Sequence, residues 1–180
     1  MRVSYQTMLA EFERVLTKYG FSADRAHDAA EIFAQNSLAG VFSHGLNRFP
    51  VAVDYLKKGE IDPAAEAECV ASFGSMERWD GHRGFGPLNA KRAMDRAVEL
   101  AKQNGIGLVA LGNNNHWMRG GTYGWLANAV VSCSAGDGLV GSGVVVSGSV
   151  GGKSDSSSFI TIPSLAARFI ISSSDILLPR

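Results

Sequence analysis

Apolar residues recur with a helical period along the first sixty positions of the chain. The pattern predicts a helix over 4–20 and a second over 22–40, each opened by a serine and closed by a glycine. A third helix is expected to begin near His44 and to end at 57–59, where two lysines precede a glycine. The N-terminal part should therefore be a group of three helices.

From residue 67 onwards the pattern shifts towards alternation, which is typical of strands. Residues 69–73 and 76–80 read as two short strands joined by Gly-Ser, so we expect a hairpin. Pro87 is placed to start a long helix that ends at 104–105. The apolar run 106–111 then reads as a buried strand after a crossover helix. Together these elements predict an α/β fold with N-terminal helices and a mixed sheet.

The segment 43–49 contains the first candidate chemistry. His44 and Arg48 are four residues apart, so on a helix starting near His44 both would face the same space. A histidine can give a proton to a carbonyl oxygen near neutral pH, and an arginine matches a carboxylate with two hydrogen bonds. The pair suits the reduction of an oxo acid. The alternative is a helix start where Arg48 is solvated and His44 only packs or caps.

A second candidate follows the predicted buried strand. Residues 113–125 are dense in polar groups, and open α/β sheets tend to bind ligands beyond the carboxyl ends of their strands. We therefore expect a role for His116 and assign none to His27 or His82. The alternative is a structural loop stabilised by asparagine turns.

Composition narrows the classes of function. Lys plus Arg and Asp plus Glu number 17 each, so the balanced charge argues against nucleic-acid binding. Cys69 and Cys133 form no C-x-x-C motif, which argues against disulfides or a cysteine zinc site and favours the cytoplasm. The N-terminus does not resemble a signal peptide, and no window has the roughly 20 apolar residues of a membrane span.

Two motifs in register carry a resemblance that covers about residues 1–127. Ser-His-Gly-x-x-Arg-Phe-Pro at 43–50 and Asn-His-Trp-Met-Arg-Gly-Gly-Thr-Tyr-Gly-Trp at 115–125 resemble the malate/L-lactate dehydrogenase type 2 family. The resemblance implies an α/β fold that is not a Rossmann fold and a homodimer in the cytoplasm. It also implies NAD, used as NADH, in reducing a ketone beside a carboxylate, as in the conversion of 2,3-diketo-L-gulonate to 3-keto-L-gulonate.

The same resemblance assigns roles by position. It makes His44 the proton donor, His116 the second active-site histidine, and Ser43, Arg48 and Arg119 substrate-binding residues. In ureidoglycolate-oxidising members the second histidine is itself the acid and base. Many members have glycine two residues after that histidine, where this chain has Met118; the Trp-Met-Arg-Gly-Gly version points to the diketogulonate branch. Malate, lactate or ureidoglycolate dehydrogenation is the alternative within the family.

Residues 128–180 are rich in serine, glycine and valine and do not align with the family. We expect 1–127 to form the substrate and catalytic part and 128–180 a tail from a shifted frame or an artificial terminus. Residues 136–141 satisfy G-x-G-x-x-G and Asp155 could mimic a ribose ligand, but residues 142–148 make a fair strand and a poor helix. A glycine-rich hairpin or disorder is therefore preferred to a phosphate cradle. The alternative function is a catalytically silent, truncated fragment of such an enzyme.

Overall fold

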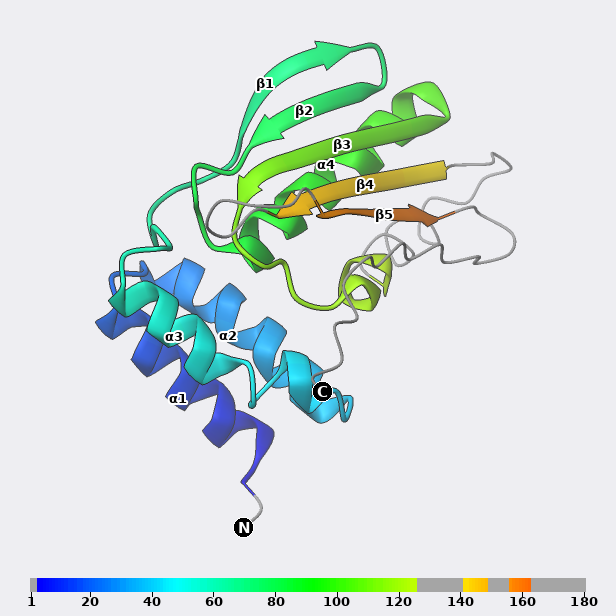
Figure 1. The fold of residues 1–180 in the computed structure, drawn as a ribbon. Coiled ribbons are helices and arrows are strands. Elements are labelled where there is room, and N and C mark those ends of the chain that lie inside the picture. The colour runs from blue at the N-terminus through cyan, green and yellow to red at the C-terminus, as the bar shows by residue number, and fades with distance from the viewer. Residues whose placement is uncertain (1–2, 126–140, 149–155, 163–180) are drawn as a thin grey trace, which may run out of the picture.

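The computed structural model describes residues 3–125, 141–148 and 156–162. Three helices, α1 (Tyr5–Lys18), α2 (Ala23–Leu38) and α3 (Phe49–Lys57), lie together on one side of the molecule (Figure 1). The Ser4 hydroxyl caps α1 by accepting a hydrogen bond from the N–H of Thr7. The predicted group of three N-terminal helices is confirmed.

Beside the helices lies a five-stranded mixed sheet, as the sequence predicted. The strands follow the chain order across the sheet, and they are β1 (Glu68–Phe73), β2 (Met76–Asp80), β3 (Ile106–Asn114), β4 (Gly141–Gly148) and β5 (Ser156–Ile162). The β1–β2 and β4–β5 pairs are antiparallel, whereas β2–β3 and β3–β4 are parallel. The expected hairpin at 69–80 and the expected crossover helix, α4 (Gly86–Asn104), are therefore both present.

Two hydrophobic clusters hold these layers. The first joins α1, α2 and α3 around a group of phenylalanines in which Phe12 stacks on Phe49 and Phe33 meets Phe49 edge-on. The second fills the space between α4 and the sheet, with Ala93, Met94, Val109 and Leu111 at its centre. Helix α4 contributes to both clusters, because Leu88 packs with the phenylalanines and Ala93 with the sheet.

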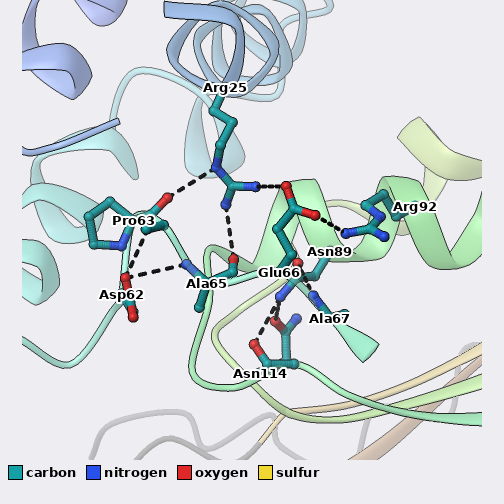
Figure 2. Close-up of polar contacts among 11 residues, drawn as sticks. Arg25, Asp62, Pro63, Ala65, Glu66, Ala67, Asn89, Arg92 and Asn114 are labelled. Carbon is teal, nitrogen blue, oxygen red and sulfur yellow. Dashed lines mark hydrogen bonds and ion pairs between the residues drawn. The ribbon is translucent and has the colours of Figure 1, made fainter. Parts of the chain in front are cut away.

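Polar contacts join the helical layer to the sheet layer (Figure 2). Arg25 of α2 donates to the carbonyl groups of Pro63 and Ala65 and pairs with Glu66, which also pairs with Arg92 of α4. These bonds hold the segment that connects α3 to β1 against helices α2 and α4. The relative position of the two layers is thus set by directional bonds as well as by apolar packing.

The start of α3 corrects one prediction. The helix begins at Phe49, while Phe42–His44 forms a separate 3-10 turn, so His44 and Arg48 do not share a helix face. Gly45, with φ −115° and ψ −121°, interrupts any helix between them. Pro50 also requires a nearby helix start, because a proline in a helix interior loses a hydrogen bond and clashes with the preceding turn.

Only part of the predicted tail lies within the described residues. Gly141, the last residue of the G-x-G-x-x-G motif, begins strand β4, so the helix that a phosphate cradle needs does not follow it. Strands β4 and β5 pair antiparallel, whereas the sequence left a glycine-rich hairpin and disorder both open for the stretch that begins at 136. Positions 136–140, Asp155 and Cys133 lie outside the described residues, and the domain boundary at 127 stays a prediction. Within the described part of the chain, no helix is long and apolar enough to cross a membrane.

Candidate functional site

His44 lies in the loop between α2 and α3, which α2 holds closely. The Ser37 hydroxyl accepts a hydrogen bond from the N–H of Leu46 at 2.8 Å and donates to the carbonyl of Phe33. A Cβ on Gly45 would lie 2.3 Å from the Ser37 oxygen, so only glycine permits this approach. The loop that presents His44 is therefore seated directly on the last turn of α2.

His116 lies just beyond the end of β3, where the sequence placed it. Asn89 of α4 donates to the side-chain oxygen of Asn114 at 3.0 Å and to the carbonyl of Gly81, which fixes the strand end (Figure 2). The N–H of Met118 donates to Nδ1 of His116 at 2.9 Å. Because Nδ1 accepts that bond, the neutral imidazole has its proton on Nε2. Asparagine side chains do stabilise this segment, as the structural alternative expected, because Asn114 also donates to the carbonyl of Asn115 and Asn113 donates to Asp80.

The two segments bring the predicted residues together. The imidazole rings of His44 and His116 have centroids 5.8 Å apart with an angle of 37° between their planes. Ser43 lies beside them, with its hydroxyl 3.0 Å from Nδ1 of His44. Arg48 and Arg119 are near enough for their charges to act on the His44 imidazole. The structure thus gathers all five predicted site residues in one place.

Burial and positive charge lower the pKa of both imidazoles. Desolvation, followed by the charges of Arg48 and Arg119, lowers the pKa of His44 below its usual value. The pKa of His116 falls to about 4, mainly through burial and then through Arg48 and His44. Because both histidines are disfavoured as cations, an anion placed beside the guanidinium groups would restore part of their proton affinity.

The other titratable candidates lie elsewhere. His27 pairs with Glu13 on the helical surface, and His82 lies beside Glu68 and Asp80 in the turn after β2. Among the described residues, no group of three His, Cys, Asp or Glu side chains could hold a metal ion. A site of paired imidazoles and guanidinium groups suits proton transfer to an anionic substrate.

Sequence reasoning missed Asn36 and gave Thr122 no role. The Asn36 amide bonds to the His44 carbonyl and receives the Thr122 hydroxyl, so it touches both halves of the site. The sequence does contain a signal for Asn36, which stands one turn after Ile32 and Phe33 and so falls on the same, buried face of α2. A polar residue on an apolar helix face indicates a specific partner.

Comparison with known proteins identifies the family of this chain. The model of the malate/L-lactate dehydrogenase family matches residues 3–132. The chain belongs to that family. It is 51% identical over 127 residues to proteins named 2,3-diketo-L-gulonate reductase from Mannheimia succiniciproducens and Escherichia fergusonii. These matches cover 71% of this chain and 38% of each relative, so the matched part spans well under half the length of those relatives.

Solved structures agree with this assignment. A malate dehydrogenase from Pyrococcus horikoshii matches with a TM-score of 0.71 and 29% identity, over 78% of this chain and 38% of that one. A protein described as a putative malate/lactate dehydrogenase from E. coli matches with a TM-score of 0.69 and 32% identity, over 72% and 36%. The expected family fold is confirmed.

Proposed function

We propose that this chain carries the substrate-binding and proton-donating part of a nicotinamide-dependent reductase that acts on a 2-oxo sugar acid. The observation that supports the proposal most is the convergence of two imidazoles, both with lowered pKa, and two guanidinium groups from distant segments. Relatives named 2,3-diketo-L-gulonate reductase share half of the aligned residues, which favours a diketo sugar acid over malate or lactate.

Arg48 and Arg119 are the groups we assign to the acid end of the substrate. A guanidinium binds a carboxylate through two parallel hydrogen bonds, which fixes both the position and the orientation of the adjacent ketone. The charges of both guanidinium groups lower the pKa of His44, so two cations act at this end of the site. The positive charge of the site is therefore matched to an anion.

His44 is the proton donor in this proposal, and His116 is a neutral hydrogen-bond donor. The pKa of His116, about 4, leaves it uncharged near neutral pH, with an Nε2–H available to a carbonyl oxygen. His44 is less buried, and a bound carboxylate would raise its pKa towards the range where it carries a proton. The proton then moves to the carbonyl oxygen as negative charge develops there.

The cofactor assignment rests on the family. A nicotinamide nucleotide, which we propose to be NADH, would supply the hydride to the carbonyl carbon. The glycine motif at 136–141 is not assigned to its phosphates, because Gly141 begins strand β4 and not a helix whose N–H groups could bind them. The roles given above therefore concern the acid substrate alone. The homodimer also remains part of the proposal, and sedimentation velocity would measure it.

The test compares NADH oxidation by the 180-residue chain on 2,3-diketo-L-gulonate with its variants His44→Asn and Arg48→Gln. We expect kcat to fall by about 100-fold or more in His44→Asn, and KM to rise in Arg48→Gln. His27→Asn is the matched control, because His27 lies on the helical surface beside Glu13. Near-normal turnover in His44→Asn would remove the proton-donor role. Binding of the acid without NADH oxidation would favour the catalytically silent alternative.

A further inference from the structure

Asn36 is a fully buried amide among apolar neighbours in the last turns of α2. Its residue is 2% exposed, and the buried face that it shares contains Ile32 and Phe33. Burial of an amide costs free energy unless both its donor and its acceptor find partners. The partners of Asn36 therefore explain why an amide stands here.

Those partners belong to the two halves of the site. The Nδ2 group donates to the backbone carbonyl of His44 at 3.1 Å, and Oδ1 accepts from the Thr122 hydroxyl at 3.0 Å. A carbonyl can only accept and a hydroxyl can donate, so these partners fix which way the amide faces. Thr122 lies in the helical turn 120–125, directly after the segment of His116 and Arg119.

We propose that Asn36 is a positioning residue, whose amide sets the distance between the segment of His44 and Arg48 and the segment of His116 and Arg119. The catalytic consequence rests on the proposed function, whereas the structural bridge does not. A single rigid side chain spans the two segments, so the spacing of the imidazoles depends on it directly.

Other side chains of similar size cannot make both bonds. An aspartate would still accept from Thr122 but would face the His44 carbonyl with a second acceptor. A leucine would leave both partners unpaired. The adjacent Ser37 offers a comparison, because its hydroxyl holds Leu46 of the His44 loop and makes no bond to the 120–125 turn. Ser37 thus anchors one segment, whereas Asn36 bridges the two.

Loss of the hydrogen bonds through Asn36 should change the pKa values of the two site histidines. Burial and the charge of Arg48 lower the pKa of both imidazoles. The charge of Arg119 adds to this effect at His44, and that of His44 adds to it at His116. If the two segments move apart, water enters between them and the desolvation that lowers each pKa is relieved. We expect the pKa of His116 to rise from about 4 by about one unit or more in Asn36→Ala.

The experiment follows the histidine ring resonances of the 180-residue chain by NMR across a pH titration. The chain has 4 histidines, so His27 and His82, which lie outside the site, serve as internal references. The variants are Asn36→Ala and Thr122→Val, with Thr122→Ser to restore the hydroxyl. Gln35→Ala is the matched control, because the neighbouring Gln35 amide is exposed and donates to Glu31 of the same helix. Thr122→Val removes one hydroxyl from a half-buried position, which keeps the test open if Asn36→Ala fails to fold.

The proposal predicts a raised His116 pKa in Asn36→Ala and Thr122→Val, and a value close to that of the unmodified chain in Thr122→Ser and Gln35→Ala. In the reductase assay the same two variants should lose about tenfold or more in kcat, and the double variant should lose no more than either alone. An unchanged His116 titration in a folded Thr122→Val variant would overturn the positioning role. Shifted titrations in a chain without reductase activity would uphold the bridge and refute the proposed function instead.

Discussion

Gly86, the first residue of α4, touches the segment that presents His116. A Cβ added there would lie 2.3 Å from the carbonyl oxygen of Asn115 and 2.4 Å from that of His116. Both oxygens belong to the backbone, so no side-chain rotation can relieve the clash. An ordinary contact begins at 3.4 Å, so the Gly86→Ala variant must move the His116 segment by about 1 Å.

Two effects of opposite sign act on the stability of this variant. Alanine is favoured over glycine in helices by up to about 1 kcal/mol, so an open site would gain stability. Overpacking of a tight contact costs about 1–3 kcal/mol. Because Gly86 is the first residue of α4 and the propensity gain applies to helix interiors, overpacking should dominate; we expect the free energy of unfolding to fall by about 1–2 kcal/mol. A displacement of about 1 Å at a reacting group can cost about 100-fold in kcat, so activity should suffer more than stability.

Urea unfolding and steady-state kinetics measure the two effects separately. The matched control is Gly112→Ala in β3, where an added Cβ meets only the Trp79 carbonyl at 4.0 Å. The control should keep its stability within about 1 kcal/mol. If Gly86→Ala is as stable as the unmodified chain, the segment has moved without cost and the steric argument is refuted.

Two further predictions concern charge in the site. The pKa of His116 is about 4 in the folded chain and 6.5 for an ordinary histidine, which we take for the unfolded chain. Between these two pH values the unfolded chain binds a proton that the folded chain does not. The free energy of unfolding should therefore fall as pH drops from about 6.5 to about 4. A His116→Gln variant should show a weaker decline over that window in urea titrations at several pH values, and an equal decline would contradict the assignment. Arg48→Gln removes a charge that lowers the pKa of both His44 and His116, so both NMR titrations should move upward; unchanged titrations would place Arg48 outside the pair.

Local patterns predicted most of the secondary structure. The Ser4 cap of α1, the left-handed Gly105 that ends α4 and the alternation in β2 each act within a few residues, so the sequence displays them directly. The same holds for His116, whose place beyond a buried strand follows from the order of the elements. Such features need no knowledge of which segments pack together.

Tertiary contacts determine the features of the site that local sequence patterns could not predict. The sequence put His44 and Arg48 on one helix face, whereas Gly45 closes onto Ser37 and leaves His44 in a turn before α3. The two residues still meet at the site, because the loop folds back along α2. Asn36 was passed over for the same reason, since its partners lie in segments that only the folded chain brings near.

Met118 combines an unusual backbone conformation with a buried side chain. Its φ of 69° lies in the left-handed region, which favours glycine over residues that carry a Cβ. The side chain is 5% exposed and packs in the phenylalanine cluster of the helical layer. Burial of a methionine contributes about 1.5–3 kcal/mol, which offsets the roughly 1–2 kcal/mol cost of the strained backbone. The thioether also fastens the segment of His116 to the helices.

The position of the site between the two hydrophobic clusters explains its reliance on buried amides. His44 is held by the helical layer, whereas His116 is held by the end of β3 and, through Met118, by the phenylalanine cluster, so both layers bear on the distance between their rings. Apolar packing is tolerant of small sliding, whereas a hydrogen-bonded amide fixes both distance and direction. Asn36 spans the two segments directly, and Asn89 anchors the strand end to α4, the helix that contributes to both clusters. Because each amide is buried and both its nitrogen and its oxygen have hydrogen-bond partners, replacing either one should loosen the hold on one of the segments that carry the histidine pair.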